Sequence, residues 1–140
     1  MRYYTGDIQR EPNTIFVFGS NTQGRHGAGA AKVAHDVFGA IYGQAKGLQG
    51  QSYAIVTKDL RKGYRSISKD KIISQIKDLY EFAREHPELN FKVAYRNTFS
   101  SSLNGYTGFE MIGMFIDAGP IPDNIWFSEE WRKAKIFMDI

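Results

Sequence analysis

Hydrophobic positions along the chain follow two different periods, which alternate from one end to the other. Continuous runs of β-forming residues predict buried strands at 14–18, 53–57, 91–95 and 124–127, with an edge strand at 2–4. Hydrophobic residues spaced three and four apart predict helices at 30–38, from Ser68 to the His86–Pro87 pair, at 109–116 and at 129–137. The chain therefore alternates strands with helices.

This alternation predicts an α/β fold in which a mostly parallel sheet is covered by helices on both faces. Ligands bind such sheets beyond the carboxyl ends of the strands. Three loops leave those ends, at 19–29, 57–66 and 97–108, and they hold the highest density of Gly, Asn, Ser and basic residues. We therefore expect a ligand site where these three loops meet.

Composition narrows the class of protein. The 140 residues, 42% of them hydrophobic, suit a single domain over 1–140 with a real core. The chain has no cysteine, and its three histidines are scattered, so we expect neither a metal nor a cofactor. No leader-like start and no membrane-length apolar run are visible, which favours a cytoplasmic protein without membrane contact.

The net charge of +3 is mild, but the positive residues are unevenly spread. Six of them lie within one short stretch that runs from the end of the predicted strand into the start of the next helix: Lys58, Arg61, Lys62, Arg65, Lys69 and Lys71. A solvated surface explains this segment, and so does electrostatic attraction of a phosphate-bearing substrate or of nucleic acid.

The first loop is the most informative of the three. Gly27, Ala28 and Gly29 precede a predicted helix, and small residues there let a phosphate approach the free N–H groups of the first helical turn. Close packing of the helix on its strand would also favour small residues. Asn21, at the tip of the strand, suits either a hydrogen bond to a sugar hydroxyl or a turn.

Several motifs together resemble macro domains. They are Gly6-Asp7-Ile8, the strand 15–21, the run 25–31 with Phe38-Gly39, the strand 53–58 that ends in Thr57-Lys58, and Gly105-Tyr106-Thr107-Gly108-Phe109. The order and content are most similar to the branch that contains terminal ADP-ribose protein glycohydrolase and the DNA ADP-ribosyl glycohydrolase antitoxins. The resemblance covers roughly residues 5–118. It implies a macro-like three-layer α/β/α fold with a mostly parallel mixed central sheet.

The resemblance also implies a role for individual residues. Asp7 would bind the adenine amino group, Ile8 would line that pocket, and Asn21 would reach the distal ribose. Lys58 would carry catalysis. Two loops would hold the phosphates and the distal ribose: Gly27, Ala28 and Gly29 form one, and Gly105, Tyr106, Thr107 and Gly108 the other.

One departure from the family pattern concerns the catalytic acid. The aspartate that the family places in its second glycine loop is replaced here by Thr107, and the nearest acid is Glu110. His26, just before the phosphate turn, is a further acid–base candidate, although a lone loop histidine is more often a polar surface residue.

Three functions are compatible with these residues. The first is hydrolysis of an ADP-ribosyl linkage assisted by Lys58, with ADP-ribose or an ADP-ribosylated protein or nucleic acid as partner. The second is a non-catalytic module that binds ADP-ribose or a related nucleotide. The third is association with DNA through the basic segment 58–71.

Overall fold

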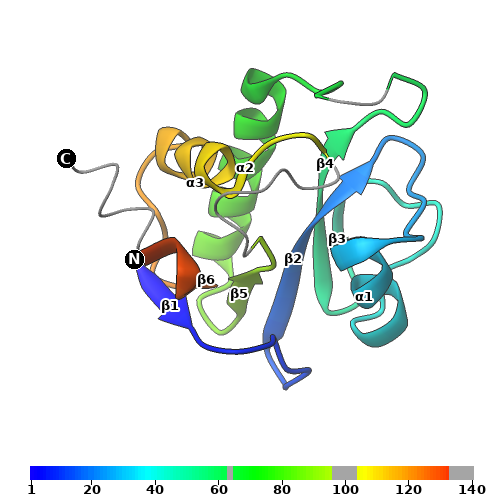
Figure 1. Ribbon diagram of the computed structural model, residues 1–140. Helices are drawn as coiled ribbons and strands as arrows, with labels where there is room; N and C mark the ends of the chain where they lie inside the picture. The colour runs from blue at the N-terminus through cyan, green and yellow to red at the C-terminus, as the bar shows by residue number, and fades with distance from the viewer. Residues whose placement is uncertain (63–64, 96–103, 133–140) are drawn as a thin grey trace.

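The computed structural model describes residues 1–62, 65–95 and 104–132 (Figure 1). Within these ranges the order of elements along the chain is β1 (Arg2–Tyr4), β2 (Thr14–Asn21), α1 (Gly29–Val37), β3 (Gly47–Gln49), β4 (Ser52–Lys58), α2 (Lys69–Glu85), β5 (Asn90–Val93), α3 (Gly108–Asp117) and β6 (Ile125–Ser128).

The strands form one six-stranded sheet in the order β1-β6-β5-β2-β4-β3. Every neighbouring pair is parallel except β3 with β4, which is antiparallel. The sheet is therefore mixed and mostly parallel, as predicted. Strand β3, at one edge, is the element that the hydrophobic pattern did not predict.

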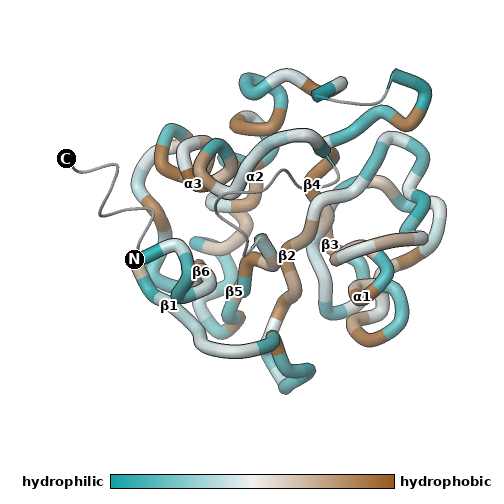
Figure 2. The backbone as a smooth tube through the Cα atoms, in the orientation of Figure 1, coloured by the Kyte–Doolittle hydropathy of each residue, from teal (hydrophilic) through white to brown (hydrophobic). Residues whose placement is uncertain are grey.

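Side chains alternate between the two faces of the sheet, and each face has its own hydrophobic core. On one face Ile15, Val17, Phe91 and Val93 pack against helices α2 and α3. On the other face Phe16, Phe18 and Ala54 pack against Ala31 and Ala34 of α1. Figure 2 shows the hydrophobic colour gathered on the central strands and alternating with hydrophilic positions along the helices. The result is the predicted three-layer α/β/α arrangement.

The helix boundaries follow their capping residues. Helix α2 begins after Ser68, whose side chain accepts a hydrogen bond from Lys71 N, so the predicted N-cap is confirmed. Of the terminal helix expected at 129–137, residues 130–132 are helical and the remainder lies outside the described residues. Within the described part of the chain, no helix is both long enough and apolar enough to cross a membrane.

Candidate functional site

The carboxyl ends of the two central strands bring the first two predicted loops together. Asn21, the last residue of β2, is the register partner of Lys58, the last residue of β4. Thr22 N donates a hydrogen bond to Lys58 O at 3.0 Å. Because neighbouring strands lie about 5 Å apart, Lys58 starts directly beside the first predicted loop, residues 19–29, which we name the glycine turn. The register shifts between Ser20 and Asn21, an irregularity that redirects side chains at a strand end.

The glycine turn ends in a helix N-terminus that has no side-chain cap. Ala28 occupies the N-cap position of α1 in extended conformation, and the first turn contains no acidic residue. Residues 27–30 are all exposed, and a Cβ added to Gly27 would meet no atom within 4 Å. Gly29 has a φ of 58°, which favours glycine. The free N–H groups and the positive end of the helix dipole therefore face open space and can accept an anion.

Asn21 shapes this turn from within. Its Oδ1 accepts hydrogen bonds from Gln23 N at 3.2 Å and Arg25 N at 2.9 Å, and its Nδ2 donates to Arg25 O at 2.7 Å. Of the two roles expected for Asn21, the turn is the one seen in these contacts. The contact with a ribose hydroxyl stays a prediction.

His26 is buried, with 3% of its surface exposed, so the expectation of a polar surface residue is wrong. Its ring lies edge-on to Phe18, with 5.3 Å between the ring centroids, and also makes an edge contact with Tyr42, which comes from the segment after α1. Nε2 lies 3.5 Å from Ser20 Oγ, and Nδ1 has no hydrogen-bond partner among the described residues. His26 thus holds the glycine turn against the end of β2.

Burial lowers the pKa of His26 below its ordinary value of 6.5, and nearby His35 lowers it further, against a smaller opposing effect of the Gln44 backbone. The unfolded chain therefore binds a proton that the folded chain rejects, and stability should fall as pH drops from 6.5 toward the lowered pKa. The loss is about 1.4 kcal/mol for each unit by which the pKa is lowered.

Urea unfolding at pH 7.5 and pH 5.0 checks this expectation. The His26→Gln variant should lose part of the pH dependence, whereas His86→Gln, at the half-buried C-cap of α2, should keep the part that His26 supplies. An identical pH dependence in wild type and His26→Gln would contradict the prediction.

The third predicted loop is held by its own side chains. Thr107 caps α3 by accepting a hydrogen bond from Glu110 N, and Glu110 Oε1 accepts one in return from Thr107 N, both at 3.1 Å. Tyr106 and Gly105 are buried, and Tyr106 Oη donates to Ile67 O at 2.7 Å. The N-terminus of α3 is thus capped by a carboxylate, in contrast to the open N-terminus of α1.

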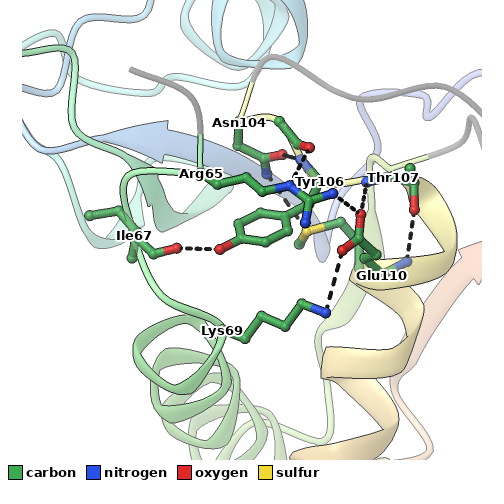
Figure 3. A network of polar contacts seen from close by, with 9 residues as sticks. Arg65, Ile67, Lys69, Asn104, Tyr106, Thr107 and Glu110 are labelled. Carbon is green, nitrogen blue, oxygen red and sulfur yellow. Dashed lines mark hydrogen bonds and ion pairs between the residues drawn. The ribbon is translucent and has the colours of Figure 1, made fainter. Parts of the chain in front are cut away.

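Glu110 forms ion pairs with two cations in addition to its hydrogen bond in the helix cap (Figure 3). Arg65 Nη2 lies 2.6 Å from Oε1, and Lys69 Nζ lies 3.4 Å from Oε2. Partial burial acts to raise the pKa of Glu110, but the hydrogen bond from Thr107 N and the charges of Lys69 and Arg65 outweigh it and lower that pKa. This environment suits an ionised structural carboxylate better than a proton donor.

Tyr95, which the sequence placed only in a strand, lies where all three loops meet. Its Oη accepts a hydrogen bond from Asn104 Nδ2 at 3.5 Å and interacts with the Thr57 side chain. A Cβ on Gly19 would collide with the same Oη. Burial raises the pKa of Tyr95 to about 12, so the phenol stays neutral. Gly19, a glycine inside β2, was the signal in the sequence that another group approaches the strand closely there.

Asp7 and Ile8 lie in the segment that leaves the edge strand β1 and leads to β2. Ile8 packs against the hydrophobic core on the α1 face, which includes Phe18. Asp7 is exposed. The structure therefore brings Ile8 to the side of the sheet that also carries the glycine turn.

The cations of the basic segment 58–71 differ in whether a carboxylate lies within ion-pair distance. Arg65 and Lys69 are paired with Glu110, and Arg61 lies 3.4 Å from the buried Asp59 while three-quarters of its own side chain stays exposed. For the half-buried Lys58, no carboxylate partner within ion-pair distance occurs in the described ranges. In the same ranges, no three His, Asp or Glu side chains are grouped as a metal site would require.

Comparison with known proteins rests on structure, because no protein-family model and no curated protein sequence matches the chain. The macrodomain of Thermus aquaticus DarG superimposes with a TM-score of 0.60 at 16% identity, covering 91% of this chain and 97% of that one. The macrodomain of Mycobacterium tuberculosis DarG gives 0.55 at 17% identity, covering 89% and 95%. The chain has the macrodomain fold.

The macrodomain fold confirms the predicted architecture over nearly the whole chain. Both neighbours are DarG macrodomains, the kind of protein that the sequence motifs resemble. In this fold the glycine turn and Lys58 meet at the carboxyl edge of the sheet. Identities of 16% and 17% establish the fold, and the roles of individual residues stay predictions.

Proposed function

We propose that this macrodomain binds ADP-ribose or an ADP-ribosyl group at the carboxyl edge of its sheet. The observation that carries the proposal is the open N-terminus of α1, which has neither a side-chain cap nor an acid in its first turn. Its N–H groups and helix dipole suit the pyrophosphate. Ile8 and Asp7, on the approach to the same face, would hold the adenine, as the macro-domain resemblance implies.

We further propose that Lys58 assists hydrolysis of the ADP-ribosyl linkage. It is the register partner of Asn21, so its side chain starts beside the residue that the family places at the distal ribose. As a nucleophile, the neutral amine would form a bond to the anomeric carbon while the bond to the modified group breaks, and that group would take up a proton. Water would then release ADP-ribose and restore the lysine. As a cation, Lys58 would instead stabilise negative charge on the departing group.

Calorimetric titration with ADP-ribose, followed by an assay of ADP-ribosylated protein and ADP-ribosylated DNA, tests both parts. We expect saturable binding and release of ADP-ribose from at least one of the two substrates. Absence of binding at millimolar ADP-ribose would overturn the whole proposal. Tight binding without turnover would overturn the proposal of catalysis and support a non-catalytic binding module.

The non-catalytic module is the second candidate, and the state of Glu110 favours it. Both oxygens of this carboxylate are engaged by Thr107 N, Arg65 and Lys69, and the family aspartate is replaced by Thr107. The third loop therefore offers no free acid among its described residues. Under this reading the chain sequesters or senses the nucleotide.

Association with nucleic acid is compatible with either candidate. Arg61 and Lys62 are exposed next to Lys58, whereas Arg65 and Lys69 are held by Glu110, so the segment offers fewer available charges than its sequence suggests. A titration of single-stranded DNA affinity against salt measures this contribution. Each phosphate contact should add about 0.7 to the slope of log affinity against log salt, and a flat response would exclude the contribution.

A further inference from the structure

Two segments that are distant in sequence are joined at Glu110, whose shorter ion pair is the one with Arg65. Arg65 Nη2 and Glu110 Oε1 lie 2.6 Å apart, across 45 positions of the chain. The side chain of Glu110 is 22% exposed and that of Arg65 39% exposed, so water screens this pair less than a fully exposed one. We name the pair the Arg65–Glu110 clamp.

Arg65 makes three further contacts with the start of the α3 segment. Its backbone N donates to Asn104 O at 3.1 Å, its Nε donates to Gly105 O at 3.1 Å, and its guanidinium lies over the ring of Tyr106 at 5.0 Å (Figure 3). Its backbone has a φ of 49°, which is unfavourable for a residue with a side chain. Such a conformation persists only where surrounding contacts hold it, and Arg65 makes these contacts from it.

The clamp connects to the glycine turn through a continuous chain of contacts. Asn104 Oδ1 accepts from Tyr106 N at 2.8 Å, and Asn104 Nδ2 donates to Tyr95 Oη at 3.5 Å. Tyr95 Oη in turn lies against Gly19 and the side chain of Thr57, the residue before Lys58. A displacement of residues 104–107 would therefore shift Tyr95 and, through it, the neighbouring residues near the ends of both β2 and β4.

We propose that Arg65 and Glu110 are positioning residues that fix the 104–107 loop, and with it the half of the site that holds the distal phosphate and ribose. The inference rests on the proposed function, in which this loop is the second glycine loop. It assigns to Glu110 a role other than the acid–base chemistry that its sequence position first suggested. It also explains why α3 carries a carboxylate cap: Glu110 orients Arg65 and caps the helix with the same oxygen, Oε1.

Affinity for two ligands in matched variants tests the proposal. AMP lacks the distal phosphate and ribose, so only ADP-ribose should report on the 104–107 loop. Glu110→Gln keeps an oxygen for the cap and removes the ion pairs. We expect ADP-ribose to bind about tenfold more weakly, a change of about 1.4 kcal/mol, with AMP affinity unchanged. Asp78→Asn makes the same charge change at an exposed pair with Lys46 and should leave both affinities as in wild type.

A double-mutant cycle shows whether the two residues act as one unit. Arg65→Met should weaken ADP-ribose binding as Glu110→Gln does, and the double variant should be no weaker than either single variant. Arg65→Lys keeps the charge but lacks the planar fork, so it should rescue only part of the loss.

The outcomes separate this inference from the function on which it rests. Wild-type protein that binds no ADP-ribose would overturn both. Wild-type binding together with an unchanged affinity in Glu110→Gln would overturn the clamp alone. Equal weakening of AMP and ADP-ribose would overturn it too, because general destabilisation does not distinguish the two ligands.

Discussion

Replacing Lys58 with Ala should lower the rate of ADP-ribosyl hydrolysis by about 10²–10⁴-fold, the range for loss of a group that acts on the reacting bond. Lys58 ends β4, and its backbone oxygen accepts the hydrogen bond from Thr22 N, a contact that Ala preserves. The fold and the open N-terminus of α1 should therefore be unaffected, and ADP-ribose should still bind. Single-turnover kinetics with ADP-ribosylated DNA and protein, beside calorimetry with ADP-ribose, separate the two effects.

A second substitution distinguishes the two roles of Lys58. Arg retains the positive charge but does not act as an amine nucleophile. Lys58→Arg should stay as inactive as Lys58→Ala if the lysine attacks the anomeric carbon, and should recover much of the rate if it acts by charge. Lys62→Ala, an exposed neighbour in the same basic segment, is the matched control. Full activity in Lys58→Ala would remove Lys58 from the mechanism.

The layout of the fold was predictable because its main elements are defined by local pattern. Strand β2 and helix α2 carry long uninterrupted signals, and α2 also begins at the predicted N-cap, Ser68. Strand β3 was missed because it is three residues long, begins with glycine and owes its conformation to pairing with β4. The meeting of the first two loops followed from the parallel arrangement alone.

The parts of the site that could not be predicted depend on contacts between distant residues. His26 is buried, and its ring contacts Phe18 of β2 and Tyr42 of the segment after α1, which no pattern around His26 indicates. Glu110 is paired with Arg65, which lies 45 positions away in the sequence. The residues around Glu110 therefore suggested a catalytic acid, whereas the structure shows an ion-paired helix cap. For both residues the sequence showed a polar group near the site. It did not show which contacts that group makes, and the contacts determine its role.

Introducing a carboxylate at Gly27 should abolish ADP-ribose binding without unfolding the protein. A Cβ at this position would meet no atom within 4 Å, and the backbone does not have the positive φ that would penalise a side chain. Gly27→Glu is therefore tolerated by the fold, yet it places a side chain and a negative charge in front of the first turn of α1. That position is where the pyrophosphate would approach.

The expected loss of affinity is at least about 10²-fold, since the added carboxylate repels the phosphate, offsets the positive end of the helix dipole and obstructs the approach to the N–H groups. Thermal unfolding should stay close to wild type. Val33→Glu adds the same charge to an exposed position farther along α1 and should bind normally. Gly27→Ala should show an intermediate loss, because a methyl group obstructs without repelling. If Gly27→Glu binds ADP-ribose as wild type does, the phosphates lie elsewhere, and the open end of α1 is a feature of the fold alone.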